Sequence, residues 1–247
     1  MSVAESLLRE LGISRPQDLD LDVIAWHTGL RVDRKPLTGC DARIVGAGDK
    51  GVLTVSTRQS PERQRFSIAH ELGHWHLHRG LLMLCRGDEI EASTSSAKGF
   101  EREADAFAAS LLMPHNLFVS AAQALTSREP WVQVQELARQ FGTSLTATAL
   151  RMIALDTWQG WLVCSSGGQR RWFRTSPSLA QDWFPKSEID DRSPAFTMHF
   201  DITAPNPRPR RLSGTVWFDS PEARRTEVFE HSRRFNSSDV LTLIRTA

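Results

Sequence analysis

The sequence has no long hydrophobic run. No stretch approaches the ~18 consecutive apolar residues of a membrane-spanning helix, and the first residues, MSVAESLLRELG, begin an amphipathic helix rather than a secretion signal. An excess of one charge is also absent, because 30 basic residues stand against 29 acidic ones. We therefore expect a cytoplasmic protein without a membrane partner, and the charge balance does not favour direct binding to nucleic acid.

Cysteine is scarce and tyrosine is absent. Cys40, Cys85 and Cys164 are an odd, widely spaced set without a CxxC pair, which argues against a disulfide framework and fits free thiols in a reducing compartment. Without tyrosine, a catalytic site would need a histidine, an arginine, a backbone N–H or a metal to stabilise an oxyanion. The rest of the composition, 40% hydrophobic and 24% charged over 247 residues, is that of an ordinary globular protein.

Helix signals surround a small sheet in the first half of the chain. Two short helices are predicted at residues 2–12 and from about 20 to 29. Short alternating runs then predict a small antiparallel sheet, with strands at 30–37, 42–45 and 51–57. Longer helices follow at 61–78 and from about 101 to 113, with the polar segment 86–99 as an exposed loop between them.

Strand signals dominate beyond residue 157, where we place a domain boundary. Five strands are predicted there, at 160–166, 170–176, 196–204, 212–218 and 240–246. The prediction is thus an α+β chain in three parts. These are a helical core with a small sheet at 1–119, a helical segment at 120–157 and a strand-rich domain at 158–247.

The string His70-Glu71-Leu72-Gly73-His74 is an HExxH motif within the predicted helix 61–78. Residues four apart on a helix lie ~6 Å apart on one face, so both imidazoles can reach one ion, as zinc requires. Glu71 projects about 100° round the helix from His70, where it can reach an activated water without binding the metal. Chance alone gives this motif in roughly one such chain in seventy, so a third ligand must support it.

Glu101 is the expected third ligand, because a catalytic zinc site needs three protein ligands and an open position. Glu101 and Asp105 lie on the flank of the apolar face of the predicted helix 101–113, where a carboxylate needs a cationic partner. Asp105 can accept the free ring N–H of a ligating histidine and fix its tautomer. Glu103 points about 200° away from Glu101, and it is the alternative ligand if the helix phase differs.

Two further residues of the HExxH helix call for an explanation. His78 continues the i, i+4 series of His70 and His74, but ~12 Å of helix rise separates it from His70, so we expect it beside the site and not among the ligands. Gly73 costs ~1 kcal/mol relative to alanine inside a helix. We therefore expect another element to approach the helix closely at Gly73.

Two strings resemble the ImmA/IrrE family of zinc metallo-endopeptidases. They are RQRFSIAHELGHWHLH at 63–78 and EREADAFAASLLMP at 101–114. A weaker match, ELARQFGTSLTATALRM at 136–152, is similar to the helix-turn-helix-like segment that follows the peptidase core in that family. The resemblance covers most of residues 1–155 and implies a zincin-like core, whereas the strand-rich remainder is only loosely like the family's variable, sometimes sensor-like, C-terminal parts.

The resemblance also implies functions for individual residues. His70, His74 and Glu101 would hold Zn²⁺ and Glu71 would be the catalytic acid/base, in agreement with the spacing argument. Family members of this kind cut a specific transcriptional repressor and so induce stress or mobile-element genes. Because no repressor domain is fused to the N-terminus here, the implied substrate is a repressor in trans.

Two other hypotheses compete with the peptidase. In one, residues 136–152 bind DNA, with Ser144 capping a recognition helix that offers Thr146, Thr148 and Arg151 but no cluster of basic residues. In the other, the zinc is structural and the strand-rich part senses a ligand or partner. A helix pair that packs on the peptidase core explains residues 136–152 without DNA. An intact Glu71 beside an open coordination position argues against a purely structural zinc.

Overall fold

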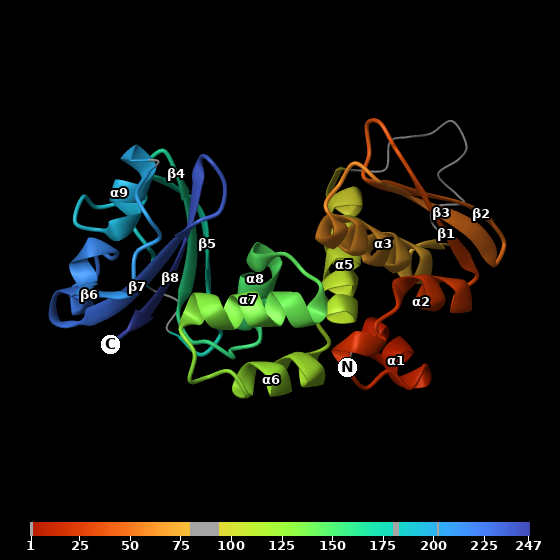
Figure 1. Cartoon of the computed structure of the whole chain (residues 1–247), viewed down its shortest axis with the longest axis horizontal. Coiled ribbons are helices and arrows are strands. Elements are labelled where there is room, and N and C mark those ends of the chain that lie inside the picture. Colours follow the sequence, from red (N-terminus) through yellow and green to blue (C-terminus); the bar gives the residue numbers. More distant parts are fainter. Residues whose placement is uncertain (1, 80–93, 180–182, 202) are drawn as a thin grey trace. The chain divides into compact units, whose positions relative to one another are not determined.

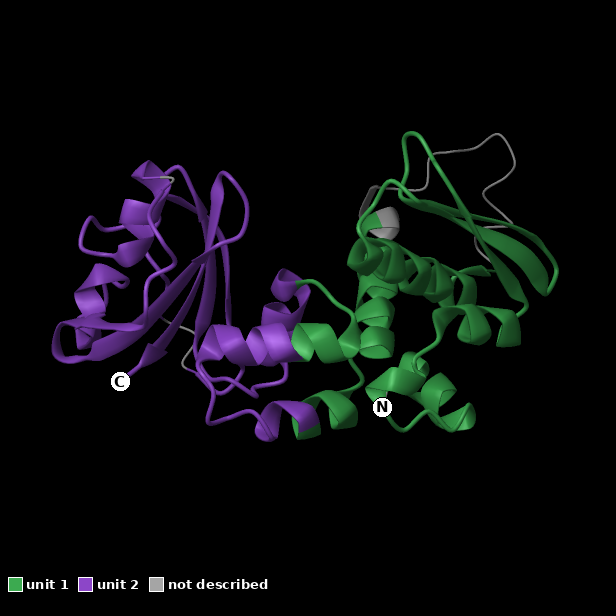
Figure 2. Cartoon of the chain, viewed as in Figure 1, with its two compact units in different colours: residues 1–120, 137–144 green, residues 121–136, 145–247 purple. Residues whose placement is uncertain are grey.

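The computed structural model describes residues 2–79, 94–179, 183–201 and 203–247. They form two compact units, residues 1–120 with 137–144 (unit 1) and residues 121–136 with 145–247 (unit 2), shown in two colours in Figure 2. Helices and two sheets are both present, so the α+β class predicted from the sequence is confirmed. The division into 1–119, 120–157 and 158–247 stays a prediction about which parts fold independently.

Helices and a three-stranded sheet build unit 1 (Figure 1). Its elements in chain order are α1 (Val3–Glu10), η1 (Pro16–Asp18), α2 (Leu21–His27), β1 (Leu30–Lys35), β2 (Ala42–Ala47), β3 (Lys50–Ser56), α3 (Pro61–Leu77), α5 (Thr94–Leu112) and most of α6 (His115–Gln123). The helices α7 (Pro130–Phe141) and α8 (Leu145–Ala154) follow, and the unit boundary runs through α7.

The sheet of unit 1 is mixed, so the predicted antiparallel sheet is wrong for one strand. The strand order is β1-β3-β2, in which β2 pairs antiparallel with β3 and β1 pairs parallel with it. The hairpin of β2 and β3 has the short loop that an antiparallel pair requires. The connection from β1 to β2 is longer and lets β1 pair with the other edge of β3. Strand periodicity does not indicate whether such a pair is parallel or antiparallel.

The two long helices of unit 1 begin and end at recognisable signals. Ser60 caps α3 by accepting a hydrogen bond from the Arg63 N–H at 3.3 Å, and Pro61 occupies the first helical position. The helix ends at Leu77, close to the predicted end. Helix α5 begins at Thr94, earlier than the predicted Glu101. The prediction missed its first turns because their small polar residues show no apolar periodicity. The remainder of the predicted loop, 86–93, lies outside the described residues.

Unit 2 is built on a five-stranded antiparallel sheet in the order β5-β4-β8-β7-β6. Its strands and short helices are β4 (Trp161–Ser166), β5 (Gln169–Thr175), α9 (Pro194–Phe200), β6 (Arg210–Ser213), η2 (Gly214–Val216), η3 (Glu222–Arg225), β7 (Glu227–Arg234) and β8 (Asp239–Thr246). Gly167 and Gly168 join β4 to β5 with φ angles of +57° and +77°, the conformation that a two-residue hairpin turn needs.

The structure corrects two strand predictions in unit 2 and adds one strand that was not predicted. Residues 196–204 were expected to be a strand, but helix α9 occupies Pro194–Phe200, because Ser193 caps it and Pro194 starts it. The expected strand 212–218 gives way to a 3-10 turn after Ser213. Strand β7 was not predicted, since charged residues interrupt the alternation of EVFEHSRR.

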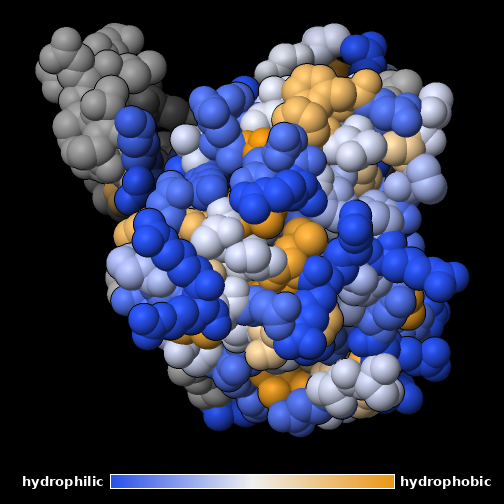
Figure 3. Space-filling view, turned by 90° about the vertical axis from the view of Figure 1, so that its left-hand side faces the viewer, coloured by the Kyte–Doolittle hydropathy of each residue, from blue (hydrophilic) through white to orange (hydrophobic). Residues whose placement is uncertain are grey.

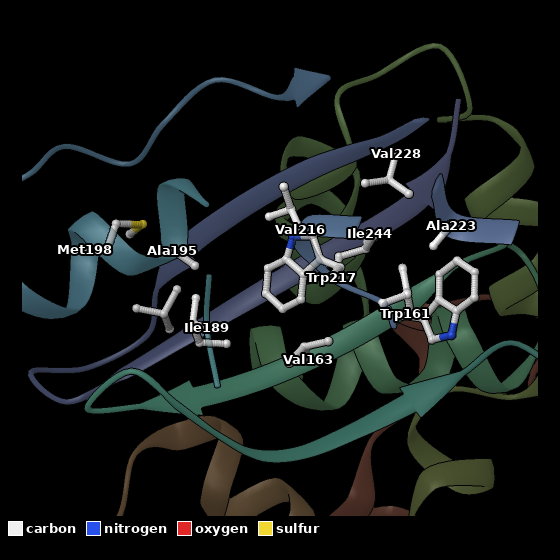
Figure 4. Close-up of a cluster of buried hydrophobic side chains, with 12 residues drawn as sticks. Trp161, Val163, Ile189, Ala195, Met198, Val216, Trp217, Ala223, Val228 and Ile244 are labelled. Carbon is white, nitrogen blue, oxygen red and sulfur yellow. The ribbon is translucent and has the colours of Figure 1, made fainter. Parts of the chain in front are cut away.

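An aromatic and aliphatic core fills one face of the unit 2 sheet (Figure 4). Trp161 and Trp217 belong to this core and are each 2% exposed, and the ring centroids of Trp161 and Phe218 are 4.7 Å apart. Glu230 is the one buried carboxylate among the described residues, and it lies beside this core, where it accepts a hydrogen bond from Trp217 Nε1. The side of the protein surface shown in Figure 3 is largely hydrophilic, with apolar side chains in separate patches.

Candidate metal centre

Helix α3 points two imidazoles at one place. His70 and His74 are one turn apart, and their Nε2 atoms lie 3.1 Å from each other. Both side chains are mostly buried, at 18% and 13% exposure. The spacing predicted from the HExxH motif is therefore realised as a convergent pair of ring nitrogens.

Glu101 of α5 completes the group from the neighbouring helix. Its Oε2 lies 3.3 Å from Nε2 of His70, and its Oε1 lies 3.3 Å from Nε2 of His74. One ligand atom from each of the three residues lies within 4.8 Å of the others, as a shared ion requires. Among the described residues this is the one cluster of histidine, cysteine and acidic side chains with such spacing.

The hydrogen bonds on the far side of each imidazole show that this group suits a cation. Nδ1 of His70 lies 2.9 Å from Oδ1 of Asp105, so its ring proton has an acceptor there. Nδ1 of His74 lies 3.1 Å from Nδ1 of His78. With protons on both Nδ1 atoms, the two Nε2 lone pairs and the Glu101 carboxylate converge without a donor. A proton can satisfy one of these contacts, whereas a divalent cation satisfies all of them.

Glu71 lies beside the same point without joining the ligand group. Its side chain lines a cleft together with His70 and Glu101. Burial raises the pKa of Glu71, an effect that His70 opposes and that the Glu101 carboxylate reinforces. A half-buried carboxyl group with a raised pKa, placed in a cleft, is suited to taking up and releasing a proton during catalysis.

The start of β2 also lines the cleft. Its wall includes Asp41, Ala42, Arg63, Phe66 and Ser67 in addition to the metal-site residues. Arg63 is fixed by an ion pair to Asp41 at 2.7 Å, and the Gln59 amide donates to the same carboxylate at 2.7 Å. Arg63, Phe66 and Ser67 belong to the string 63–78, whereas Asp41 and Ala42 carried no motif in the sequence, and only the fold brings those two residues to the site.

Glu103, the alternative ligand, is placed elsewhere. Its Oε2 lies 2.8 Å from Nε2 of His78, and His78 itself is 3% exposed. His78 sits at the C-cap of α3, next to His74, as expected from its distance along the helix. The structure thus brings together His70, His74, Glu101 and Asp105 on one side and His78 with Glu103 on the other. Sequence reasoning missed the second pair, although the i, i+4 histidine series pointed to half of it.

Comparison with known proteins agrees with the resemblance seen in the sequence. The profile of the peptidase M78 family, described as the IrrE N-terminal-like domain, matches residues 26–152. The chain belongs to this family. M78 is a family of metallopeptidases, and the matched range contains α3 and α5 and hence every residue of the candidate metal centre.

The other comparisons bear on the fold and do not identify a substrate. A solved structure named "Mycobacterium tuberculosis transcriptional regulator" is similar with a TM-score of 0.63 and 17% identity, covering 98% of this chain and 74% of that one. No curated protein matches the sequence. None of the helices in the described ranges has both the length and the apolar character needed to span a membrane.

Proposed function

We propose that this chain is a zinc-dependent endopeptidase, with His70, His74 and Glu101 as metal ligands and Glu71 as the catalytic acid/base. The observation that carries the proposal is the convergence of two histidine ring nitrogens and one carboxylate on a single point, beside the Glu71 side chain in the same cleft. Two imidazoles and one carboxylate are a common ligand set of catalytic zinc, which leaves a fourth position open.

The protein residues divide the chemistry between them. Bound zinc supplies a Lewis acid that activates water and polarises a peptide carbonyl. Glu71 takes the proton from the water and delivers it to the leaving amine, a transfer for which its raised pKa is suited. Asp105 holds His70 in the tautomer that leaves Nε2 free for the metal.

A protein substrate follows from membership of a peptidase family. The lining of the cleft suits the binding of an extended segment of the substrate chain. Ala42, at the start of β2, lines the cleft, and β2 is an outer strand of the sheet among the strands described. We propose, on the family resemblance, that the substrate is a helix-turn-helix transcriptional repressor acting in trans, cut in the cytoplasm to induce stress or mobile-element genes.

The helical segment 136–152 gives little support to the DNA-binding alternative. In α8, Thr148 is fully buried together with Ala149 and Met152, so it cannot reach a base edge. Helix α8 packs instead against β4 and β5 within unit 2. The sensor alternative, with a structural zinc, does not explain why Glu71 lies in an open cleft beside the ligand group.

The test combines metal analysis with a trapping variant. The purified wild-type chain is expected to hold one zinc and to cut a bound repressor, while Glu71→Gln holds zinc and retains the intact repressor in a pull-down. Loss of the acid/base group lowers the cleavage rate by about 10²- to 10⁴-fold. Equal cleavage by wild type and Glu71→Gln contradicts the mechanism, and a chain that never binds zinc contradicts the whole proposal.

A further inference from the structure

The two histidines of the metal centre are supported in different ways. His70 makes a direct contact with a carboxylate, because its Nδ1 lies 2.9 Å from Oδ1 of Asp105. His74 has no carboxylate at its Nδ1 among the described residues, and a second imidazole, that of His78, stands there at 3.1 Å. The carboxylate comes one step later, since Nε2 of His78 lies 2.8 Å from Oε2 of Glu103.

The acceptor at the end of this chain fixes the position of each proton. Glu103 as a carboxylate can only accept, so Nε2 of His78 must donate to it. A neutral His78 then carries no proton on Nδ1, which becomes an acceptor for Nδ1–H of His74. His74 in turn has an unprotonated Nε2, the atom that faces His70 and Glu101.

We propose that His78 and Glu103 are positioning residues that select the metal-binding tautomer of His74 through this two-step hydrogen-bond relay. The inference rests on the zinc site of the proposed function. Glu103, the alternative ligand of the sequence analysis, would then act on the metal site through His78, which contacts the ligand His74. Hydrogen-bond partners behind a ligating histidine orient its ring and raise its basicity.

The surroundings of His78 favour such a role over that of a plain helix-end residue. His78 is 3% exposed, and Phe100 of α5 packs against it with ring centroids 4.7 Å apart. A buried imidazole needs partners for both nitrogens, and here the partners are His74 and Glu103. Glu103 is on α5 and His74 is on α3, so the relay makes the orientation of a ligand on α3 depend on the position of α5.

The experiment measures zinc affinity and tautomers in the full-length chain. Zinc affinity is determined by competition with a chromophoric chelator for wild type, Glu103→Gln and Glu62→Gln. Glu62, in the first turn of α3, provides a control with the same change of charge away from the site. Because the Glu103 side chain is 62% exposed, its replacement leaves the fold intact. We expect roughly tenfold weaker zinc binding for Glu103→Gln and wild-type binding for Glu62→Gln.

Long-range ¹H–¹⁵N NMR of the histidine side chains supplies a readout that a purely structural role would not move. In the wild type, His78 is expected as the Nε2–H tautomer with or without zinc, and zinc-bound His74 as the Nδ1–H tautomer. Glu103→Gln should mix the His78 tautomers. An Nδ1–H tautomer of His78 in the wild type, or unchanged zinc affinity of Glu103→Gln, overturns the relay. Failure of the wild type to bind zinc overturns the proposed function instead, and the His78 tautomer of the zinc-free chain still decides the relay.

Discussion

Gly73 of α3 lies directly against Ala104 of α5. A Cβ atom at position 73 would stand 3.0 Å from the Ala104 Cα and 3.1 Å from the Ala104 carbonyl oxygen. These atoms belong to the backbone and cannot turn aside, so the absence of a side chain at Gly73 sets how closely the two helices approach. The close approach expected from a glycine inside the helix is therefore found, and α5 is the element that makes it.

Gly73→Ala should separate the two helices and so weaken both folding and the metal site. The gain in helix propensity, ~1 kcal/mol, is outweighed by overpacking against a backbone, which typically costs about 1–3 kcal/mol. Gly99→Ala is the matched control, because nothing lies within 4 Å of a Cβ at that position of α5. Urea unfolding and zinc titration of both variants check this. A more stable Gly73→Ala with normal zinc affinity would contradict it.

Glu101→Gln should abolish tight zinc binding, because it removes the charge of a direct ligand. The loss should exceed the 10- to 100-fold that an outer-shell partner contributes. Competition with a chelator measures it, and Arg102→Gln, a neighbour on α5, serves as the control. If Glu101→Gln still bound zinc as tightly as the wild type, the ligand set assigned to α5 would be wrong.

Glu230 should make unit 2 more stable in mild acid than in mild alkali. Its carboxyl group accepts hydrogen bonds from Ser193, Ser232, Trp217 and the Ala195 N–H, but burial dominates and raises its pKa. The folded chain then holds a proton that the unfolded chain releases, so stability falls as pH rises from the ordinary glutamate pKa through the raised one.

The measurement for Glu230 is urea unfolding of wild type and Glu230→Gln between pH 5 and pH 8. Relative to Glu230→Gln, the wild type should lose stability with rising pH by at most about 1.4 kcal/mol per pH unit. Glu188→Gln, at an exposed carboxylate of the same unit, should follow the wild type. A wild type that gains stability over Glu230→Gln as pH rises would show that the hydrogen bonds outweigh burial.

The full-length chain should not shift duplex DNA in a gel, even at low salt. The chain has a net charge of +1, and the α8 residue Thr148 is buried. Non-specific binding depends on neutralising phosphates with several basic side chains, which α8 does not offer. A salt-sensitive shift that Arg151→Gln abolishes would revive the DNA-binding alternative.

The metal centre was the part of the molecule most open to sequence reasoning, because its parts lie on two helices with strong periodicity. His70 and His74 follow from helical spacing alone, and the phase of α5 places Glu101 and Asp105 on the side that faces them. Glu103 was considered only as an alternative ligand, and its contact with His78 was missed, because a helical wheel gives direction relative to the core and not toward the end of a neighbouring helix. Its partner His78 sits at that end.

The strands were less predictable, because pairing is set by distant residues. The direction of β1 against β3 depends on the path of its connection, which leaves no periodic signal. Helix α9 carries apolar and β-branched residues that suit a strand, yet Ser193 and Pro194 start a helix there. In β7, His231 and Glu230 are buried through tertiary contacts, so its hydrophobic alternation is hidden.

The ligands of the candidate site come from two neighbouring helices, α3 and α5, so bound metal would affect stability as well as activity. An ion held by His74 and Glu101 would cross-link two segments far apart in sequence, and its binding energy would count as folding energy. At zinc one hundred times above its dissociation constant, the gain would be about 2.7 kcal/mol. Zinc starvation would then stop catalysis and also lower the unfolding temperature of the metal-free protein, which would be degraded sooner.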